Sequence, residues 1–189
     1  MANKIKYGLS NVKVFPISTT SAAGTPTYGS AIPVPGAVSL TLDPAGNETS
    51  FYADNVVYFS AYANNGYTGT IEFAHIPDGF KTGVLGWTTD TNGVVLEAAG
   101  TLGKEFAMTY QFEGDANDTK FVLYRCTAQR PAGGSSTQTE TITPQTESFT
   151  FTAMPRIDDK TIKAYAEAGT AAYATFDTVP YVVGSTIAT

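Results

Sequence analysis

Histidine and cysteine, the side chains with the widest chemical repertoire, occur once each in this sequence, as His75 and Cys126. One histidine leaves no multi-histidine metal site, and any Ser-His-Asp or Cys-His arrangement would depend on His75 alone. His75 follows a predicted strand and closely precedes Pro77, so we expect a structural or solvent-exposed role. Cys126 shares one side of a predicted strand with Tyr124 and Ala128, which predicts a small buried side chain rather than a reactive thiol. A single cysteine can form neither an internal disulfide nor a cysteine zinc site.

Paired carboxylates are the remaining candidates for acid–base chemistry, because two of them across a cleft can hydrolyse a glycosidic bond. Asp158-Asp159 and the pair Asp115 and Asp118 lie in turn-like stretches, where aspartate commonly binds backbone groups. The sequence contains no phosphate-binding or dinucleotide-binding glycine motif. We therefore expect no enzymatic activity, no cofactor and no metal site.

Charge and composition exclude two classes of partner. The 189 residues carry a net charge of −6, and only 15% of them are charged, against about 25% in an average soluble protein. A basic nucleic-acid-binding surface and a polybasic membrane anchor are thereby excluded. No stretch approaches the roughly 18 apolar residues of a membrane-spanning helix. Residues 1–8 include Lys4 and Lys6 but no apolar run, so we expect no signal peptide, no membrane insertion and synthesis in a cytoplasm.

Strand patterns dominate the chain and predict one mainly β domain over residues 1–189, an antiparallel sandwich or barrel. The clearest alternating or aromatic runs are residues 5–14, 38–42, 51–64, 68–73, 106–113, 121–129 and 148–153. A change of parity at Ser10-Asn11 indicates a β-bulge. Asn65-Gly66 predicts a two-residue hairpin between the aromatic run and the strand that follows, because a type I′ turn needs positive φ at both positions.

Only short helices are expected. One is predicted over residues 80–85, with Asp78 as its N-cap, and a second over residues 171–176, capped by Thr170. Residues 160–168 fit either a helix or a last strand with small and apolar residues on one side. These residues are Ile162, Ala164 and Ala166.

The polar sides of four predicted strands share one composition: hydroxyls, an amide and a few carboxylates, without lysine or arginine. They comprise Ser39, Thr41, Asp43, Thr68, Thr70, Glu72, Thr109, Gln111, Glu113, Ser148, Thr150 and Thr152. A solvated sheet face would explain the polarity, but exposed strands commonly use cationic residues against edge-to-edge pairing. A wall without cations also suits a surface past which a polyanion slides, because basic groups would bind its phosphates. Both interpretations stay open at this point.

Short segments between about residues 4 and 155 give the chain a resemblance to a known family. The segments are Lys4-Ile5-Lys6-Tyr7-Gly8-Leu9-Ser10-Asn11-Val12, Ile32-Pro33-Val34-Pro35-Gly36-Ala37-Val38-Ser39-Leu40, Asp43-Pro44-Ala45-Gly46, Phe51-Tyr52-Ala53-Asp54-Asn55, Ala63-Asn64-Asn65-Gly66-Tyr67, Ile76-Pro77-Asp78-Gly79-Phe80, Val122-Leu123-Tyr124, Thr127-Ala128, Arg130-Pro131, Pro144-Gln145-Thr146-Glu147 and Phe149-Thr150-Phe151-Thr152-Ala153. In their joint order they resemble the major tail protein, or tail tube protein, of long-tailed bacteriophages.

The resemblance implies a structural β-sandwich subunit that forms hexameric rings, which stack into a tail tube. The genome passes through the tube during ejection, and the twelve polar strand residues are then expected to face the lumen. The implied location is the virion tail, after synthesis in a bacterial host cytoplasm. The implied partners are further copies of the chain, tape-measure, tail-terminator and distal tail proteins, and DNA in transient, non-specific passage.

Stacking requires segments that reach the next ring. The resemblance implies an extended N-terminal arm, an inter-ring loop near residues 44–55 and a C-terminal segment after residue 156, and residues 18–29 form a further predicted loop. Aromatic side chains commonly anchor interfaces, and polar tips suit the rim. The residues expected in the inter-ring contact are Phe51, Tyr52, Asp54 and Asn55.

Two alternatives stay open. The first is a related tube or decoration protein, such as the inner tube of a contractile tail or a β domain on a capsid surface. The second is a carbohydrate-binding β-sandwich, because Trp87, Tyr52 and Tyr58 offer aromatic surfaces for sugars.

Overall fold

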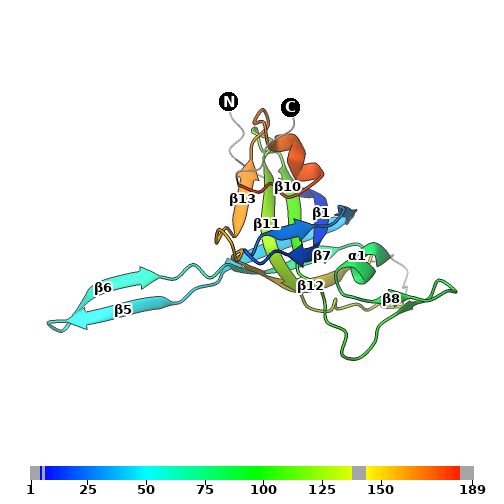
Figure 1. Cartoon of the computed structure of the whole chain (residues 1–189), viewed down its shortest axis with the longest axis horizontal. Helices are drawn as coiled ribbons and strands as arrows, with labels where there is room; N and C mark the ends of the chain where they lie inside the picture. Colours follow the sequence, from blue (N-terminus) through cyan, green and yellow to red (C-terminus); the bar gives the residue numbers. More distant parts are fainter. Residues whose placement is uncertain (1–4, 6, 138–143, 184–189) are drawn as a thin grey trace.

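A computed structural model describes residue 5 and residues 7–137 and 144–183, and the fold is mainly antiparallel β, as predicted (Figure 1). Nine strands form the main sheet. They are β1 (Tyr7–Thr20), β2 (Pro26–Tyr28), β3 (Ile32–Pro33), β4 (Ala37–Pro44), β7 (Tyr67–Phe73), β10 (Phe106–Glu113), β11 (Lys120–Ala128), β12 (Glu147–Met154) and β13 (Lys163–Ala166). Predictions for Lys4, Lys6 and most of the N-terminal arm lie outside the described residues.

The strands follow one another in the order β2-β1-β10-β11-β12-β7-β4, with β3 paired to β1 and β13 paired to β11. This path does not close, so the strands form a curved open sheet rather than a closed barrel. The predicted strands over residues 106–113 and 121–129 are confirmed as β10 and β11, which pair antiparallel. The predicted bulge is confirmed as well, because the β1–β10 register shifts after Ser10 and Asn11 has a φ of 53°.

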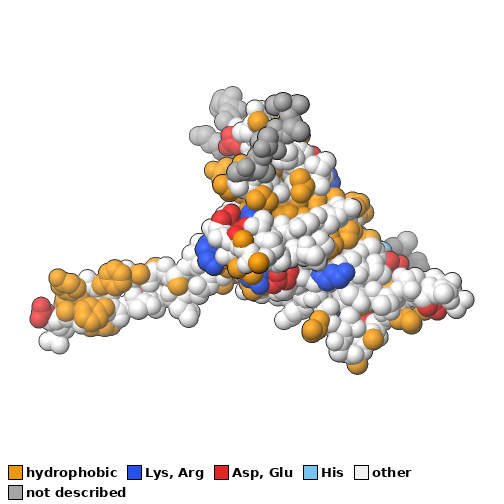
Figure 2. Space-filling model, in the orientation of Figure 1, with side chains coloured by type: hydrophobic (Ala, Val, Ile, Leu, Met, Phe, Trp, Pro, Cys, Tyr) orange, Lys and Arg blue, Asp and Glu red, His pale blue; other side chains and the backbone are white. Residues whose placement is uncertain are grey.

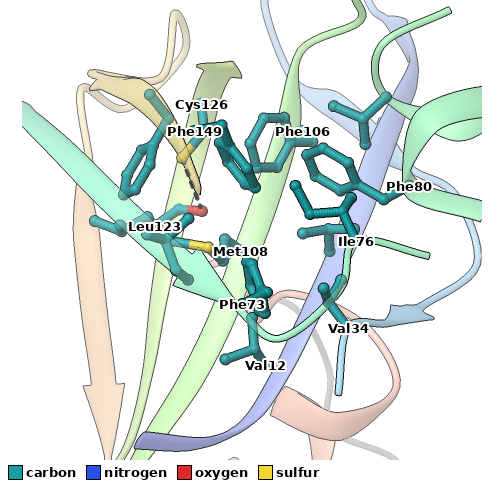
Figure 3. Close-up of a cluster of buried hydrophobic side chains, with 14 of the residues drawn as sticks. Val12, Val34, Phe73, Ile76, Phe80, Phe106, Met108, Leu123, Cys126 and Phe149 are labelled. Atoms are coloured by element: carbon teal, nitrogen blue, oxygen red, sulfur yellow. Dashed lines mark hydrogen bonds between the residues drawn. The ribbon is translucent and has the colours of Figure 1, made fainter. Parts of the chain in front are cut away.

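The main core lies in the concavity of the sheet, where β1, β7, β10, β11 and β12 all contribute buried side chains (Figure 3). The helix α1 (Asp78–Gly83) covers it with Phe80, whose ring lies 4.8 Å from the Phe149 ring and 6.0 Å from the Phe106 ring. Each such side chain contributes about 1.5–3 kcal/mol when it is fully buried. The alternation of apolar and polar residues along a strand determines which side chains enter this core. In β7, Ile71 and Phe73 point into it while their neighbours point outward.

Gly69 on β7 faces the core like Ile71 and Phe73. The close packing around it leaves no room for a side chain. A Cβ at this position would lie 2.6 Å from the Phe151 ring and 2.7 Å from the carbonyl oxygen of Thr41. Any larger residue would separate β7 from β4 or displace the ring.

A second, smaller core lies on the opposite face of the sheet. Phe15, Ala107, Val122 and Tyr124 form its floor on β1, β10 and β11. Residues 167–181, which contain the 3₁₀ helix η1 (Tyr173–Asp177), lie over them; we call this segment the C-terminal cover. β13 pairs with β11 in the sheet beside it and contributes Ala164 and Ala166 to this second core. The alternating pattern at residues 160–168 is thus a strand rather than a helix.

The predicted helices are shifted. α1 begins at Asp78 rather than residue 80, because Pro77, with φ of −68°, occupies the N-cap and Asp78 lies in the first turn. The second predicted helix, over residues 171–176, is instead the single 3₁₀ turn η1. Thr170 does not cap it: its hydroxyl donates 2.8 Å to the carbonyl of Glu167.

The predicted Asn65-Gly66 hairpin is wrong. β5 (Glu48–Ala53) pairs with β6 (Val56–Tyr62), and the turn between them is Asp54-Asn55, with φ of 53° and 62°. Two consecutive positive φ angles are what a type I′ turn needs. Gly66, with φ of 113°, instead lies where a Cβ would be 2.0 Å from the carbonyl oxygen of Ala153.

The β5–β6 hairpin continues the β4–β7 pair away from the body of the molecule (Figure 1). Ala45 donates to Gly66, Asn65 donates to Ala45 and Ala63 donates to Asn47, at 2.8–3.1 Å, so hydrogen bonds connect the two pairs. The inter-ring loop expected at residues 44–55 is therefore not a loop but one side of this hairpin. A second small pair, β8 (Thr88–Thr89) and β9 (Val95–Leu96), turns at Asn92-Gly93.

Candidate assembly surfaces

The lone histidine lies at the surface beside a carboxylate, and the lone cysteine lies in the main core. The His75 side chain is 70% exposed, and its Nδ1 lies 3.4 Å from a carboxylate oxygen of Glu147. Cys126 is fully buried in the main core, and burial raises the pKa of its thiol well above the ordinary range. A thiol that does not ionise is a poor nucleophile.

The two carboxylate pairs considered for acid–base chemistry bind their own surroundings. Asp158 and Asp159 face the buried guanidinium of Arg156, and Asp158 accepts two hydrogen bonds from it. Asp115 accepts hydrogen bonds from backbone N–H groups of its own loop. Among the residues that the structure describes, no three His, Cys, Asp or Glu side chains are grouped closely enough to hold a metal ion. In the same part of the chain, no helix has the length and apolarity to span a membrane.

The most exposed apolar surface belongs to the β5–β6 hairpin, residues 48–62, which we call the arm. Seven of its large side chains are at least half exposed, and Figure 2 shows hydrophobic patches along the projection. They are Phe51, Tyr52, Val56, Val57, Tyr58, Phe59 and Tyr62. Apolar surface of this extent on a narrow hairpin indicates an interaction site. Sequence reasoning expected contacts from Phe51, Tyr52, Asp54 and Asn55, and from the aromatic residues Tyr58 and Tyr62 of β6. It missed Val56, Val57 and Phe59.

The two faces of the arm differ. On one face Phe51 pairs with Phe59 across the strands. On the other, the Glu48 carboxylate accepts hydrogen bonds from the hydroxyls of Ser60 at 2.6 Å and Tyr62 at 3.1 Å. These bonds lower the pKa of Glu48, so that the carboxylate stays ionised. The arm therefore has an aromatic face and a hydrogen-bonded, anionic face.

Nine of the twelve polar strand residues form a contiguous surface on β4, β7 and β12, which we call the polar grid. The strand register places them in three rows across the sheet. The rows are Ser39–Glu72–Ser148, Thr41–Thr70–Thr150 and Asp43–Thr68–Thr152. Thr127 of β11 is exposed and pairs with Thr152, so it extends the last row; sequence reasoning missed it.

The polar grid contains two carboxylates, the exposed Asp43 and the half-buried Glu72. Glu72 accepts hydrogen bonds from Thr146 at 2.5 Å and from Ser39 at 3.0 Å, and these bonds lower the pKa of its carboxyl group. The nearest cation along β11, Arg125, is bound by both carboxylate oxygens of Glu105 at 2.9–3.0 Å from Nε. The surface offered to solvent is thus hydroxylated and negative.

The fourth strand does not join this surface, contrary to expectation. Thr109 on β10 is only 3% exposed, because the C-terminal cover lies over that part of the sheet. Gln111 is held beneath the same cover, where its amide donates to Asp118 and to the Tyr173 hydroxyl. Glu113 is exposed at the end of β10, opposite Tyr7 on β1.

An ionic cluster fixes the C-terminal cover to the sheet. Asp177 accepts hydrogen bonds from Lys120 at 2.5 Å and from Lys13 and Asn11 at 2.9 Å each. Burial alone would raise the pKa of Asp177, but the bonds from Lys120, Lys13 and Asn11 outweigh it and hold the pKa well below its ordinary value. The Lys120 ammonium group also lies 3.8 Å from the Tyr173 ring centroid.

The three aromatic residues considered for sugar binding are not brought together. Tyr52 and Tyr58 lie on the arm, whereas Trp87 follows α1 and packs against the main core. The Lys81 ammonium group lies 5.9 Å from the Trp87 ring. The three rings therefore form no common platform for a sugar.

Comparisons with known proteins add little to this geometry. No family model matches the sequence, and no curated protein matches it. Among solved structures, the chain is similar to the anti-feeding prophage cap, a tube terminating cap determined by cryo-EM. The two share 9% sequence identity and a TM-score of 0.47, over 89% of this chain and 95% of that one. At this level the likeness supports no inference about function.

Proposed function

We propose that this protein is the structural subunit of the tail tube of a long-tailed bacteriophage. Copies of the single domain form hexameric rings, the rings stack, and the channel conducts the genome during ejection. The observation that carries the proposal is the arm, with seven large apolar side chains exposed. An isolated two-stranded hairpin is marginally stable in water, so the arm needs a protein surface to cover it. A polymer of identical subunits supplies that surface at every position except the end.

The polar grid supports the second half of the proposal. Its three rows present hydroxyls with the carboxylates of Asp43 and Glu72 and without lysine or arginine. Such a lumen wall repels phosphates weakly and holds none of them, because tight binding of DNA depends on cationic groups. Closure of subunits into a ring would also protect the exposed edges of β2 and β4 from uncontrolled pairing.

The proposal assigns no catalytic role and no cofactor. The partners are other copies of the chain within and between rings, tail proteins such as the tape measure, the terminator and the distal tail protein, and DNA that passes without sequence preference. The protein acts in the virion tail after synthesis in the bacterial cytoplasm.

Negative-stain electron microscopy of concentrated purified protein tests the proposal directly. We expect flexible tubes without a sheath, with hexameric rings in cross-section. A shortened-arm variant removes residues 48–53 and 56–62 and joins Asn47 to Asp54-Asn55 and Ala63. The Asn47–Ala63 hydrogen bond then flanks the retained two-residue turn. This variant should stay folded, with an unchanged melting transition at low concentration, and should form no tubes.

Several results would overturn the proposal. Wild-type protein that stays monomeric at high concentration, or tubes of normal length from the shortened-arm variant, would contradict a role for the arm. Rings that bind only to capsids, or tubes that assemble inside a contractile sheath, would favour the decoration or contractile-tail alternatives.

The lumen assignment has its own test. Replacing Asp43 and Glu72 by lysine should leave tubes intact but slow DNA ejection several-fold, because each ring would then bind phosphates. The delay should shrink as salt concentration rises. Glu167→Lys on the exposed end of the C-terminal cover is the matched control and should eject at the normal rate. Normal ejection from the double variant would contradict the assignment of the polar grid to the lumen.

A further inference from the structure

An apolar groove of about 610 Å³ opens between the beginning of β1, β4 and the distal parts of β10 and β11. It is the part of the main core that α1 does not cover. The residues that give it its apolar character are Leu40, Leu42, Tyr67, Tyr110, Phe112 and Phe121. The Tyr110 and Phe121 rings stack 5.3 Å apart, and Phe112 meets Phe121 edge-on at 5.6 Å. The groove is thus a preformed aromatic site of the size that accommodates a few inserted side chains.

The charge at the groove indicates what kind of partner it would bind. Lys163 is the one charged residue among the described residues that line it. Its ammonium group lies 5.0 Å from the Tyr67 ring centroid and makes no ion pair with a described residue. Glu113 lies next to Gly8, elsewhere along the groove. A partner with exposed aromatic side chains would match the aromatic lining, and an acidic group on it could pair with Lys163.

The arm of the same chain has these properties. Near its tip it presents Phe51 and Phe59 on one face, and both of its charged residues, Glu48 and Asp54, are acidic. Glu48 is engaged by the hydroxyls of its own hairpin, whereas Asp54 is exposed in the turn at the tip. The arm projects away from the body of its own subunit (Figure 1), so the groove that it fills belongs to another copy.

We propose that the arm of one subunit docks in the apolar groove of a second subunit, with Asp54 against Lys163. This inference rests on the proposed function and adds the receiving surface to it. The contact is heterologous, because the two partners use different surfaces. Aromatic burial supplies its affinity, and the Asp54–Lys163 pair fixes its direction.

A charge exchange tests the contact. Asp54→Lys and Lys163→Glu, each alone, should raise the protein concentration needed for tube formation by about tenfold or more, because each opposes like charges in the interface. The double variant with both changes restores attraction, so its critical concentration should return to within about threefold of wild type. Tube formation is followed by light scattering and electron microscopy, and melting of each variant at low concentration verifies its fold.

The control exchange combines Asp54→Lys with Lys104→Glu, since Lys104 is exposed outside the groove. This pair should not restore assembly. The docking inference is overturned if the single variants assemble like wild type, if the double variant assembles no better than the singles, or if the control pair restores assembly equally well. In each of these cases wild-type tubes that depend on the arm would still support the tail tube, whereas absence of wild-type tubes would reject the proposed function itself.

Discussion

The C-terminal cover and the arm both extend from the same sheet, but the apolar side chains of the cover are buried and those of the arm are exposed. Phe176 of the cover is 1% exposed and lies on the second core, whereas Phe59 of the arm is 57% exposed. The cover is also fixed by the Asp177 cluster, while the arm continues the β4–β7 pair into solvent. The cover therefore stabilises the fold of its own chain, whereas the arm is the surface that we propose to contact other chains.

Truncation of Phe176 to alanine should give the largest loss of stability. The ring is buried against the second core and stacks on Tyr181 with centroids 6.5 Å apart. Loss of a buried phenylalanine side chain costs about 3–5 kcal/mol. Urea unfolding at a concentration below assembly measures the change. A loss under about 1 kcal/mol would mean that the cover contributes little to the fold, and the contrast with the arm would fail.

Asp177→Asn should have an intermediate effect. The change removes the counter-charge of Lys120, whose side chain is only 9% exposed, and of Lys13. Breaking such a contact costs about 1–2 kcal/mol after allowance for the partial exposure of Asp177. Urea unfolding at neutral pH measures it, with Asp54→Asn on the arm as the control that should leave the free energy of unfolding unchanged.

The pH dependence sharpens this prediction. Because the folded-state pKa of Asp177 is depressed, its stabilising contribution is complete above the unfolded-state pKa of about 3.9 and declines as pH falls through the folded-state value. The stability difference between wild type and Asp177→Asn should therefore be constant near neutral pH and shrink below about pH 4. A difference that is independent of pH down to full acid unfolding would show that the carboxylate charge is not what holds the cover.

Phe59→Ser should have the smallest effect on the isolated subunit. The ring is already exposed, so the free energy of unfolding should change by less than about 0.5 kcal/mol. The same variant should nevertheless fail to form tubes, because Phe59 and Phe51 form the aromatic face of the arm. Unfolding and assembly assays on one preparation compare the two properties. A large loss of monomer stability would show that the arm, like the C-terminal cover, stabilises its own chain, and would contradict the difference drawn between them.

Much of the fold followed from local patterns. Strict alternation in β4, β7 and β12 predicted which side chains share a face, and pairing of the strands in register then produced the polar grid. The same alternation could not predict the fate of Thr109, because the residues that bury it are supplied by the C-terminal cover, far along the chain. Periodicity predicts which side of a strand a residue occupies, but not what lies over that side.

Turn chemistry was informative but ambiguous. Two dipeptides on either side of β6, Asp54-Asn55 and Asn65-Gly66, both tolerate positive φ. The stronger local signal for a hairpin turn was at Asn65-Gly66, where no such turn forms. Gly66 serves a different need, the close approach of its backbone to Ala153 on β12. That contact between distant segments has no local signature, so the extent of the arm was not predicted from sequence.

An arm that fills a groove on a neighbour has a consequence for any polymer of this chain. Where the joined copies lie in successive rings, head-to-tail joining leaves one end of the polymer with uncovered hairpins and the other with vacant aromatic grooves. The two extremities are therefore chemically unlike, so elongation has a direction, and each extremity requires a different molecule to terminate it.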